Sequence, residues 1–375
     1  MCFGSNHGPA PVSLPRPDAA GARPSPDVAY ALWIAACMNA GWRGAPAAEQ
    51  VPVWDGLGRV TAAPVRSCRP VPRFACEAMD GAGESAGPGE DIQAGQLLIP
   101  AGHRLRPADL AAAAAAGHAT LDIARKPVAA IIPTGDEIRP IGSALRPGDL
   151  IDTNSLMLAL RAGETGAEAI VSDVQPDDPD TIAAVIRRTA LAADVVLVIA
   201  GSSAGRSDYA ATAIAEVGGL AVRGVAVRPG HPALLGHARP GQRRAGQPVP
   251  VIGIPGYPLS AAVIFELFAV RLLAVLQGWK PPDPVWQRVQ LACDWTSSPD
   301  VEDWVPVSLT PAPGDEDANC AAEATPGRHG SGSVSRLMRA HAWWRIPIGQ
   351  AKFARGEHID VQPIPGAPPV TSAPS

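Results

Sequence analysis

The middle third of this 375-residue chain alternates short apolar runs with longer amphipathic segments. The runs expected as strands are Val128–Ile132, Ala169–Val174, Val195–Ile199 and Val251–Ile254. The segments expected as helices are Asn154–Ala162, Asp178–Leu191, Tyr209–Val217 and Pro258–Gln277. Strands that alternate with helices of this length favour a parallel sheet covered on both faces. The pattern therefore predicts a three-layer α/β domain with a mostly parallel sheet.

The flanking segments have a different character. Residues 1–26 are rich in Pro, Gly and Ser and are expected to form a flexible arm. Residues 27–126 predict an N-terminal domain with a first helix after Pro26 and a second over Pro107–Ala116. The α/β domain is assigned to residues 127–280. Short strand-like pieces and the tryptophans Trp295, Trp304, Trp343 and Trp344 predict a small β domain over 281–366, followed by a tail at 367–375.

Composition excludes several classes of protein. The net charge of −5 gives no bulk attraction to nucleic acid. The six cysteines have no CxxC or Cys/His spacing, so neither a zinc site nor a disulfide framework is expected. The N-terminus lacks a basic segment followed by an apolar one, and no run of about 18 apolar residues is expected to span a membrane. The chain is predicted to be cytoplasmic.

Three loops follow predicted strands of the α/β domain. They cover Pro133–Glu137, Gly201–Tyr209 and Ile254–Ser260. In open α/β sheets, ligands bind beyond the carboxyl ends of the strands, where these loops would meet. Their small residues would let backbone N–H groups approach a phosphate, and helix N-termini at Asp208 and Pro258 would add favourable dipoles. The loops therefore predict an anion site.

Acidic side chains lie in the same loops. Asp136, Glu137 and Asp208 would repel a bare anion, so the combination favours a divalent cation, most simply Mg²⁺ with oxygen ligands. The alternative is that the loops are ordinary turns and the acidic residues are helix caps. Three such loops at one sheet edge favour the functional interpretation.

Five motifs occur in order along the chain. They are Met79-Asp80-Gly81, Thr134-Gly135-Asp136-Glu137, Ser207-Asp208-Tyr209, Arg228-Pro229-Gly230-His231-Pro232 and Pro255-Gly256-Tyr257-Pro258-Leu259-Ser260-Ala261. Together they resemble the molybdopterin molybdenumtransferase family of the gephyrin E-domain type. The likeness runs from about Asp27 to Pro365. It implies a three-layer molybdopterin-binding module, an elongated N-terminal domain and a small C-terminal β domain. It also implies insertion of molybdate into adenylated molybdopterin with Mg²⁺ and release of AMP, in a homodimer with a shared cleft.

The resemblance also implies roles for single residues. Asp80 would reach the cleft of the partner chain, while Glu137 and Asp208 would hold Mg²⁺ or its water shell against the phosphoanhydride. These three carboxylates are the expected catalytic and metal-binding residues. The expected substrate-binding residues come from the same motifs and loops: Thr134, Gly135, Gly201, Ser202, Ser203, Arg228, His231, Pro255, Gly256, Pro258 and Ser260.

The chain departs from the family pattern at three places. Arg228 and His231 lie in a segment where the family usually has lysines, and Tyr257 stands where Asn is commoner. Only Gly81–Gly89 separates Asp80 from Glu90, whereas typical members have a whole small β domain inserted there as a lid. The lid domain is therefore expected to be missing.

Two functional classes stay open, and a third is weaker. The chain is either an active enzyme without a lid, or a non-catalytic binding or scaffold protein for molybdopterin or molybdate. Asp80, Glu137 and Asp208 together favour the enzyme, and the missing lid favours the second class. A nucleotide-pyrophosphate hydrolase is the third possibility. Molybdoenzymes or other cofactor-pathway proteins are the expected partners besides a second copy of the chain.

Overall fold

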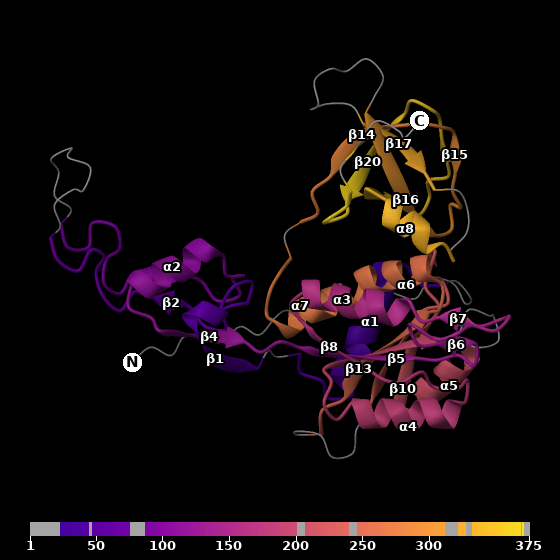
Figure 1. Ribbon diagram of the computed structural model, residues 1–375, viewed down its shortest axis with the longest axis horizontal. Coiled ribbons are helices and arrows are strands. Elements are labelled where there is room, and N and C mark those ends of the chain that lie inside the picture. The colour runs from indigo at the N-terminus through magenta and orange to yellow at the C-terminus, as the bar shows by residue number, and fades with distance from the viewer. Residues whose placement is uncertain are drawn as a thin grey trace.

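The computed structural model describes residues 23–44, 47–75, 87–200, 207–239, 246–281, 283–311, 322–327, 332–368 and 370. Figure 1 shows an elongated molecule with three parts. An N-terminal domain lies at one end, a layered α/β domain lies at the other, and a β domain rests on one face of the α/β domain.

The central sheet has six strands in the order β10-β12-β13-β9-β5-β8. Strands β13, β9, β5 and β8 are parallel, whereas β12 and β10 continue the sheet as antiparallel neighbours. This confirms the predicted mostly parallel α/β fold. The strand bounds are β5 Val128–Pro133, β8 Glu168–Val171, β9 Val195–Ala200, β10 Gly218–Arg223, β12 Leu234–Ala238 and β13 Val249–Pro255.

Helices cover both faces of this sheet. One face packs under α1, α3, α6 and α7, and the other packs under α4 and α5 (Figure 1). Every residue of β9 and β13 is buried, as expected for strands covered on both sides. The helix bounds are α1 Pro26–Asn39, α3 Asn154–Glu164, α4 Pro179–Thr189, α5 Ser207–Val217, α6 Pro258–Ile264 and α7 Val270–Leu276.

Helix α1 packs on the central sheet. The Trp33 indole N–H donates to the backbone oxygen of Gly236 at 2.7 Å, and the Trp33 ring is fully buried in the same core as α6 and α7. At Gly236 a Cβ atom would lie 2.4 Å from the Gly219 oxygen, so only glycine fits there. The structure therefore groups α1 with the α/β core rather than with residues 47–126, because its large apolar side chains find their contacts there.

The last helical stretch of the α/β domain runs from Pro258 to Leu276, with a π-helical turn over Phe265–Ala269 between α6 and α7. By length and composition it could cross a membrane, with a mean hydropathy of 2.2, so the expectation that no such run exists was wrong. Its most apolar window is 72% buried inside the protein, where it covers the sheet.

The N-terminal domain has its own small core, built from Val65, Ile99, Leu105, Ala113, Leu121 and Ile123. Strand β1 pairs with β4 and strand β2 pairs with β3, both antiparallel. The predicted helix over Pro107–Ala116 is confirmed as α2. The bounds are β1 Ala48–Pro52, β2 Val65–Arg66, β3 Leu97–Ile99, α2 Pro107–Ala115 and β4 Thr120–Ala124.

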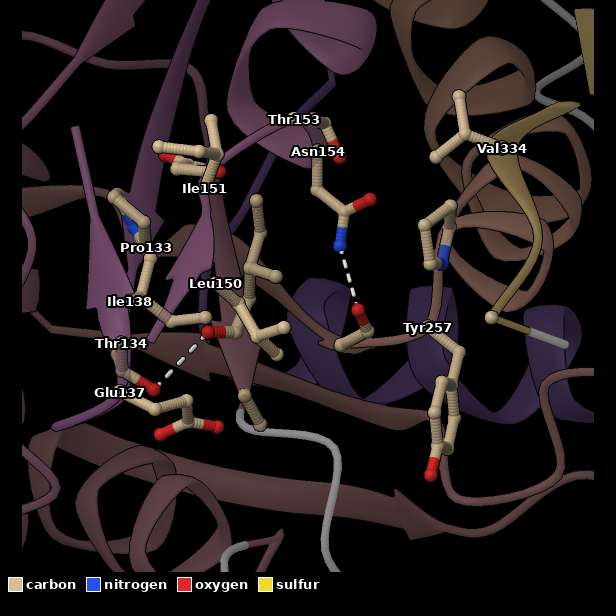
Figure 2. Close-up of a pocket in the computed structure, with 16 residues that line it drawn as sticks. Pro133, Thr134, Glu137, Ile138, Leu150, Ile151, Thr153, Asn154, Tyr257 and Val334 are labelled. Carbon is tan, nitrogen blue, oxygen red and sulfur yellow. Dashed lines mark hydrogen bonds between the residues drawn. The ribbon is translucent and has the colours of Figure 1, made fainter. Parts of the chain in front are cut away.

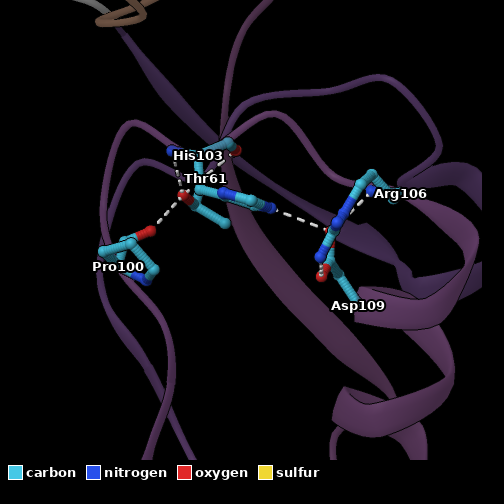
Figure 3. A network of polar contacts seen from close by, with 5 residues as sticks. All are labelled: Thr61, Pro100, His103, Arg106 and Asp109. Carbon is cyan, nitrogen blue, oxygen red and sulfur yellow. Dashed lines mark hydrogen bonds and ion pairs between the residues drawn. The ribbon is translucent and has the colours of Figure 1, made fainter.

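A charged network fixes the start of α2 (Figure 3). The Arg106 guanidinium forms two hydrogen bonds to the Asp109 carboxylate, and His103 Nε2 lies 2.8 Å from Asp109 Oδ2. Thr61 Oγ1 donates to the Pro100 oxygen and accepts from the His103 backbone N–H, which holds the His103 loop against the domain. The hydrogen bonds from Arg106, followed by those from His103, hold the pKa of the Asp109 carboxyl far below its usual range.

The Asp109 network makes the stability of this domain depend on pH. Because the folded-state pKa of Asp109 is lowered, its contribution is fully present above the unfolded pKa of about 4 and is lost progressively as pH falls from there through the folded pKa. We expect Asp109→Asn to lower the melting temperature at pH 7, and this difference to shrink steadily as pH is lowered from about 4 to about 2. Asp122 is an exposed carboxylate of the same domain, and Asp122→Asn is the control. It should leave the melting temperature unchanged at pH 7 and across this acidic range. If both substitutions lowered the melting temperature equally, the Asp109 network would not be the cause of the pH dependence.

The C-terminal domain closes into a five-stranded barrel. Its strands pair in the order β16-β17-β14-β20-β18, and β18 pairs again with β16. Strand β11, which leaves the α/β domain at Val227–Arg228, adds to the outer edge of β16 in parallel. This confirms the predicted small β domain. The bounds are β14 Gln287–Leu291, β15 Trp295–Thr296, β16 Glu302–Pro311, β17 Ala322–Pro326, α8 Val334–Arg339, β18 Ala342–Ile346, β19 Lys352–Phe353 and β20 His358–Pro363.

Candidate functional site

Three parallel strands end together at one edge of the central sheet. Pro133 of β5 is the register partner of Ile199 in β9, and Pro255 of β13 is the partner of Ala200. The predicted loops therefore leave the sheet at the same edge. This is the position at which open α/β sheets bind their ligands.

A cavity of about 370 Å³ lies at this edge (Figure 2). Residues from the ends of β5, β9 and β13, from the start of α3 and from the C-terminal domain line it. They are Pro133, Thr134, Glu137, Ile138, Leu150, Ile151, Asp152, Thr153, Asn154, Ile199, Ala200, Gly256, Tyr257, Pro258, Gly332 and Val334.

The first predicted loop forms one wall of the cavity. Thr134 donates to the Ile199 oxygen through both its backbone N–H and its hydroxyl, at 2.9 and 3.0 Å. Gly135 has a φ of +142°, and a Cβ atom there would lie 2.6 Å from Ile138, so the tight turn requires glycine. The turn presents Glu137 to the cavity (Figure 2). Gly135 itself does not line the cavity and acts through the shape of the turn.

A short parallel pair supports this wall. Strand β6, Ile138–Arg139, pairs with β7, Leu150–Ile151. The Leu150 backbone N–H also donates to the backbone oxygen of Glu137 at 2.8 Å. The chain then enters α3 through Asp152, whose Oδ1 accepts from the Ser155 N–H at 3.0 Å. Glu137 and Asp152, one beside each of these segments, both line the cavity.

The third predicted loop forms the opposite wall. Asn154 Nδ2 donates to the Gly256 oxygen at 2.8 Å, which ties this loop to the start of α3. Tyr257 is the N-cap residue of α6, and Pro258 occupies the first turn of that helix. Of the residues predicted here, Gly256 and Pro258 line the cavity, whereas Pro255 ends β13 and Ser260 is buried within α6.

Arg228 and His231 lie outside the lining of this cavity. The Arg228 guanidinium forms a two-pronged ion pair with Asp303 of β16, and Ser297 Oγ donates to the same carboxylate at 2.9 Å. Asp303 raises the pKa of Arg228 further above its ordinary value. Partial burial of the ring and the nearby charge of Arg23 lower the pKa of His231, which favours a neutral imidazole near neutral pH.

Several predicted site residues lie outside the described parts. These are Asp80, Gly201, Ser202 and Ser203, and also the side chain of Asp208, whose backbone belongs to the first turn of α5. Among the residues that the structure describes, no group of three or more His, Cys, Asp or Glu side chains is placed to hold a metal ion. The predicted set of Asp80, Glu137 and Asp208 thus remains a prediction.

The sequence analysis missed two groups of lining residues. Asp152 and Asn154 follow a two-residue strand that was too short to be recognised, although a polar Asp-Thr-Asn sequence before a helix was a usable signal. Gly332 and Val334 belong to the C-terminal domain, and a Cβ atom on Gly332 would lie 3.5 Å from the Tyr257 ring. The local sequence gives no signal for that contact.

Two family models match the chain over the parts that build this cavity. Residues 130–275 match the model described as a probable molybdopterin binding domain, and residues 288–364 match the MoeA C-terminal region (domain IV). A MoeA protein from Pyrococcus horikoshii has the same fold, with a TM-score of 0.73 and 25% identity over 90% of this chain and 98% of that chain. The chain therefore carries a molybdopterin binding domain and a C-terminal region of the MoeA type.

Curated members of the MoeA family show how far the likeness extends. A molybdopterin molybdenumtransferase from Nostoc sp. is 30% identical over 279 residues, which is 73% of this chain and 61% of the relative. Molybdopterin molybdenumtransferase 2 from Mycobacterium tuberculosis is 32% identical over 267 residues, which is 64% of each chain. This MoeA homologue therefore spans about three-fifths of the length of the curated relatives that it matches.

Proposed function

We propose that this MoeA homologue is a molybdopterin molybdenumtransferase that inserts molybdate into adenylated molybdopterin and releases AMP. The cavity at the ends of β5, β9 and β13 carries the proposal, because residues of both matched family models line it. The names of the curated relatives support the reaction class. A cytoplasmic location and partners among molybdoenzymes or cofactor-pathway proteins are parts of the same proposal.

Three carboxylates are proposed to act in the reaction. Glu137 lines the cavity, Asp208 belongs to the first turn of α5 at the same sheet edge, and Asp80 of the partner subunit would complete the set. Glu137 and Asp152 together give the described cavity two carboxylates, and Thr134 adds a hydroxyl. Such oxygen donors fit Mg²⁺. When bound, Mg²⁺ would neutralise phosphate charge during cleavage of the adenylate.

The remaining residues of the proposed site orient the substrate. Thr134, Gly135, Gly256 and Pro258 hold backbone groups at the sheet edge, and Gly201, Ser202 and Ser203 are proposed to approach a phosphate. The ion pair with Asp303 leads us to propose that Arg228 acts mainly through domain orientation. His231, Pro255 and Ser260 are retained as proposed supporting residues rather than lining residues.

A non-catalytic molybdopterin-binding protein is the second candidate. It is favoured by the short segment Gly81–Gly89, where the family usually carries a lid domain, since an open cleft leaves charged groups in a high-dielectric environment. Mass spectrometry of small molecules that co-purify with the protein gives a first indication. The deciding measurement is molybdenum insertion from adenylated molybdopterin with Mg²⁺, with and without EDTA, across a salt series.

The outcomes of that measurement separate the two candidates. Magnesium-dependent insertion that slows as salt rises supports the lidless enzyme, because salt screens exposed charges. Tight binding of molybdopterin without insertion supports the binding protein. If the protein showed neither binding nor insertion, both candidates would be contradicted.

A homodimer is also part of the proposal. Four large apolar side chains in the described part of the N-terminal domain are exposed, Trp54 at 94%, Phe74, Leu57 and Leu97, and a second copy of the chain would cover them. We expect sedimentation at micromolar concentration to give a species of twice the 38.6 kDa chain mass. Trp54→Glu should weaken the association, whereas Ile348→Glu, at an exposed apolar position of the barrel, should not. A wild-type monomer would contradict the shared cleft.

A further inference from the structure

The N-terminal domain has a core of its own. That core, which includes Leu105 and Ile123, shares no residue with the two cores that pack on the central sheet, within the described part of the chain. Figure 1 shows the domain extending away from the α/β domain. A domain without a shared apolar core is expected to rotate about its junction unless other contacts hold it. The polar contacts at the junction therefore decide the direction in which the N-terminal domain extends.

A loop over residues 102–104 forms the N-terminal side of this junction. The Gly102 N–H donates to the backbone oxygen of Thr61 at 2.8 Å, and the His103 N–H donates to the Thr61 hydroxyl at 3.0 Å (Figure 3). The next residue, Leu105, is 2% exposed and belongs to the core of the domain. The loop is therefore fixed to the N-terminal domain and moves with it.

The α/β side of the junction is fixed as well. Gln277 follows α7 and is 6% exposed, and its Nε2 donates to the backbone oxygens of Thr165 and Leu273, both at 2.9 Å. Because Thr165 follows α3, this amide ties the ends of α3 and α7 together. The two sides lie close, since a Cβ atom on Gly102 would be 2.8 Å from the Gly278 oxygen. The helix ends form a rigid platform for the loop.

Arg104 joins the loop to this platform. Its Cζ atom lies 5.3 Å from the centre of the Trp279 ring, and its Nη2 donates to the backbone oxygen of Glu164, the last residue of α3, at 3.3 Å. Its Nε donates to the Gly58 oxygen of its own domain at 3.2 Å. A cation is favourable over an indole face and at the C-terminus of a helix. One guanidinium therefore contacts both domains.

We propose that Arg104 is a positioning residue that holds the N-terminal domain in the direction in which it reaches a second copy of the chain. The inference rests on the proposed function, since it concerns the proposed homodimer with a shared cleft. The cavity lies at the start of α3, whereas Arg104 contacts the end of that helix, about 16 Å away along its axis. A domain whose direction is fixed before two copies meet lowers the ordering cost of association.

Small-angle X-ray scattering tests the direction of the domain. The measurement uses Trp54→Glu at concentrations where sedimentation gives a monomer. We expect Arg104→Ala in this background to broaden the distribution of interatomic distances, because the domain then samples several directions. Trp279→Ala should broaden it equally, and the double variant no further, since the two side chains form one contact. Arg66→Ala is the control, because Arg66 bonds the Gly95 oxygen of its own domain.

Sedimentation of the chain with Trp54 retained tests the consequence for assembly. If the competent direction falls to about a third of the population in each copy, Arg104→Ala weakens the homodimer about 10-fold, because both copies must be competent. Arg104→Lys should lie between the wild type and Arg104→Ala, since Lys keeps the charge but loses the planar group that stacks on the indole. At protein concentrations well above the dissociation constant, Arg104→Ala should insert molybdenum at the wild-type rate, because Arg104 acts on assembly.

Three results would overturn the role of Arg104. They are an unchanged distance distribution in Arg104→Ala, an unchanged dimer affinity despite a broadened distribution, and additive losses from Arg104→Ala and Trp279→Ala. Insertion of molybdenum together with any of these results would reject this inference alone. A homodimer that weakens as expected but inserts no molybdenum would reject only the enzymatic function.

Discussion

Replacing Glu137 with Gln should slow magnesium-dependent molybdenum insertion by about 100-fold, the scale for loss of one electrostatic stabiliser at a reacting group. The side chains have the same shape, so the variant should fold normally. Glu137 is the proposed magnesium residue whose position in the cavity the structure describes. The measurement is the insertion rate at saturating adenylated molybdopterin over a range of Mg²⁺ concentrations.

The matched control for Glu137 is Glu168→Gln. Glu168 begins β8, at the edge of the sheet opposite to the cavity, and its loss should leave the rate within about twofold. If both variants inserted molybdenum at the wild-type rate, Glu137 would have no part in the reaction. Asp208→Asn makes an independent test of the same idea, because Asp208 is proposed to hold the same cation from α5.

Replacing Arg228 with Ala should destabilise the chain by about 3 kcal/mol, near the lower end of the cost for removing one partner of a buried pair. Asp303 is 3% exposed and, among the residues that the structure describes, its carboxylate would keep only the hydrogen bond from Ser297. The Arg228 side chain is 39% exposed, which places the expected loss at the lower end of that range. Urea unfolding followed by tryptophan fluorescence measures the loss.

The surface pair of Arg187 and Glu216 is the control for Arg228. Both side chains are nearly half exposed, so Arg187→Ala should cost less than about 1 kcal/mol. The loss of stability for Arg228→Lys should lie between those for Arg228→Ala and Arg187→Ala. Lys keeps the charge but loses the planar guanidinium that engages both oxygens of Asp303. Equal losses for Arg228→Ala and Arg187→Ala would show that the pair does not hold the domains together.

The parallel part of the fold was predictable because each element carries its own signal. Strand β9 is a run of six buried apolar residues, and α4 has a clear apolar face with Asp178 as its N-cap. The antiparallel strands β10 and β12 were missed. Strand β10 begins with two glycines and is only partly buried, so it lacks both a continuous apolar run and a clean alternation.

The candidate site was predictable to the extent that it follows from strand ends. Thr134, Glu137 and Gly256 were found because parallel strands deliver their following loops to one edge. Asn154 was missed because its role depends on a hydrogen bond to a residue 102 positions away. Gly332 was missed for the same reason, since it reaches the cavity only through the docking of one domain on another.

The strand pairing between the domains couples two structures that are distant in sequence. The N–H of Glu302 in β16 donates to the Ala226 oxygen beside β11, at 2.9 Å. Trp304 and Trp343 of the barrel pack into the same apolar core as α6. The Glu302 amide can therefore exchange its hydrogen with solvent only when the barrel lifts away from the sheet. The hydrogen-exchange rate of that single amide therefore reports how often the barrel separates from the sheet and exposes the Gly332 side of the cavity.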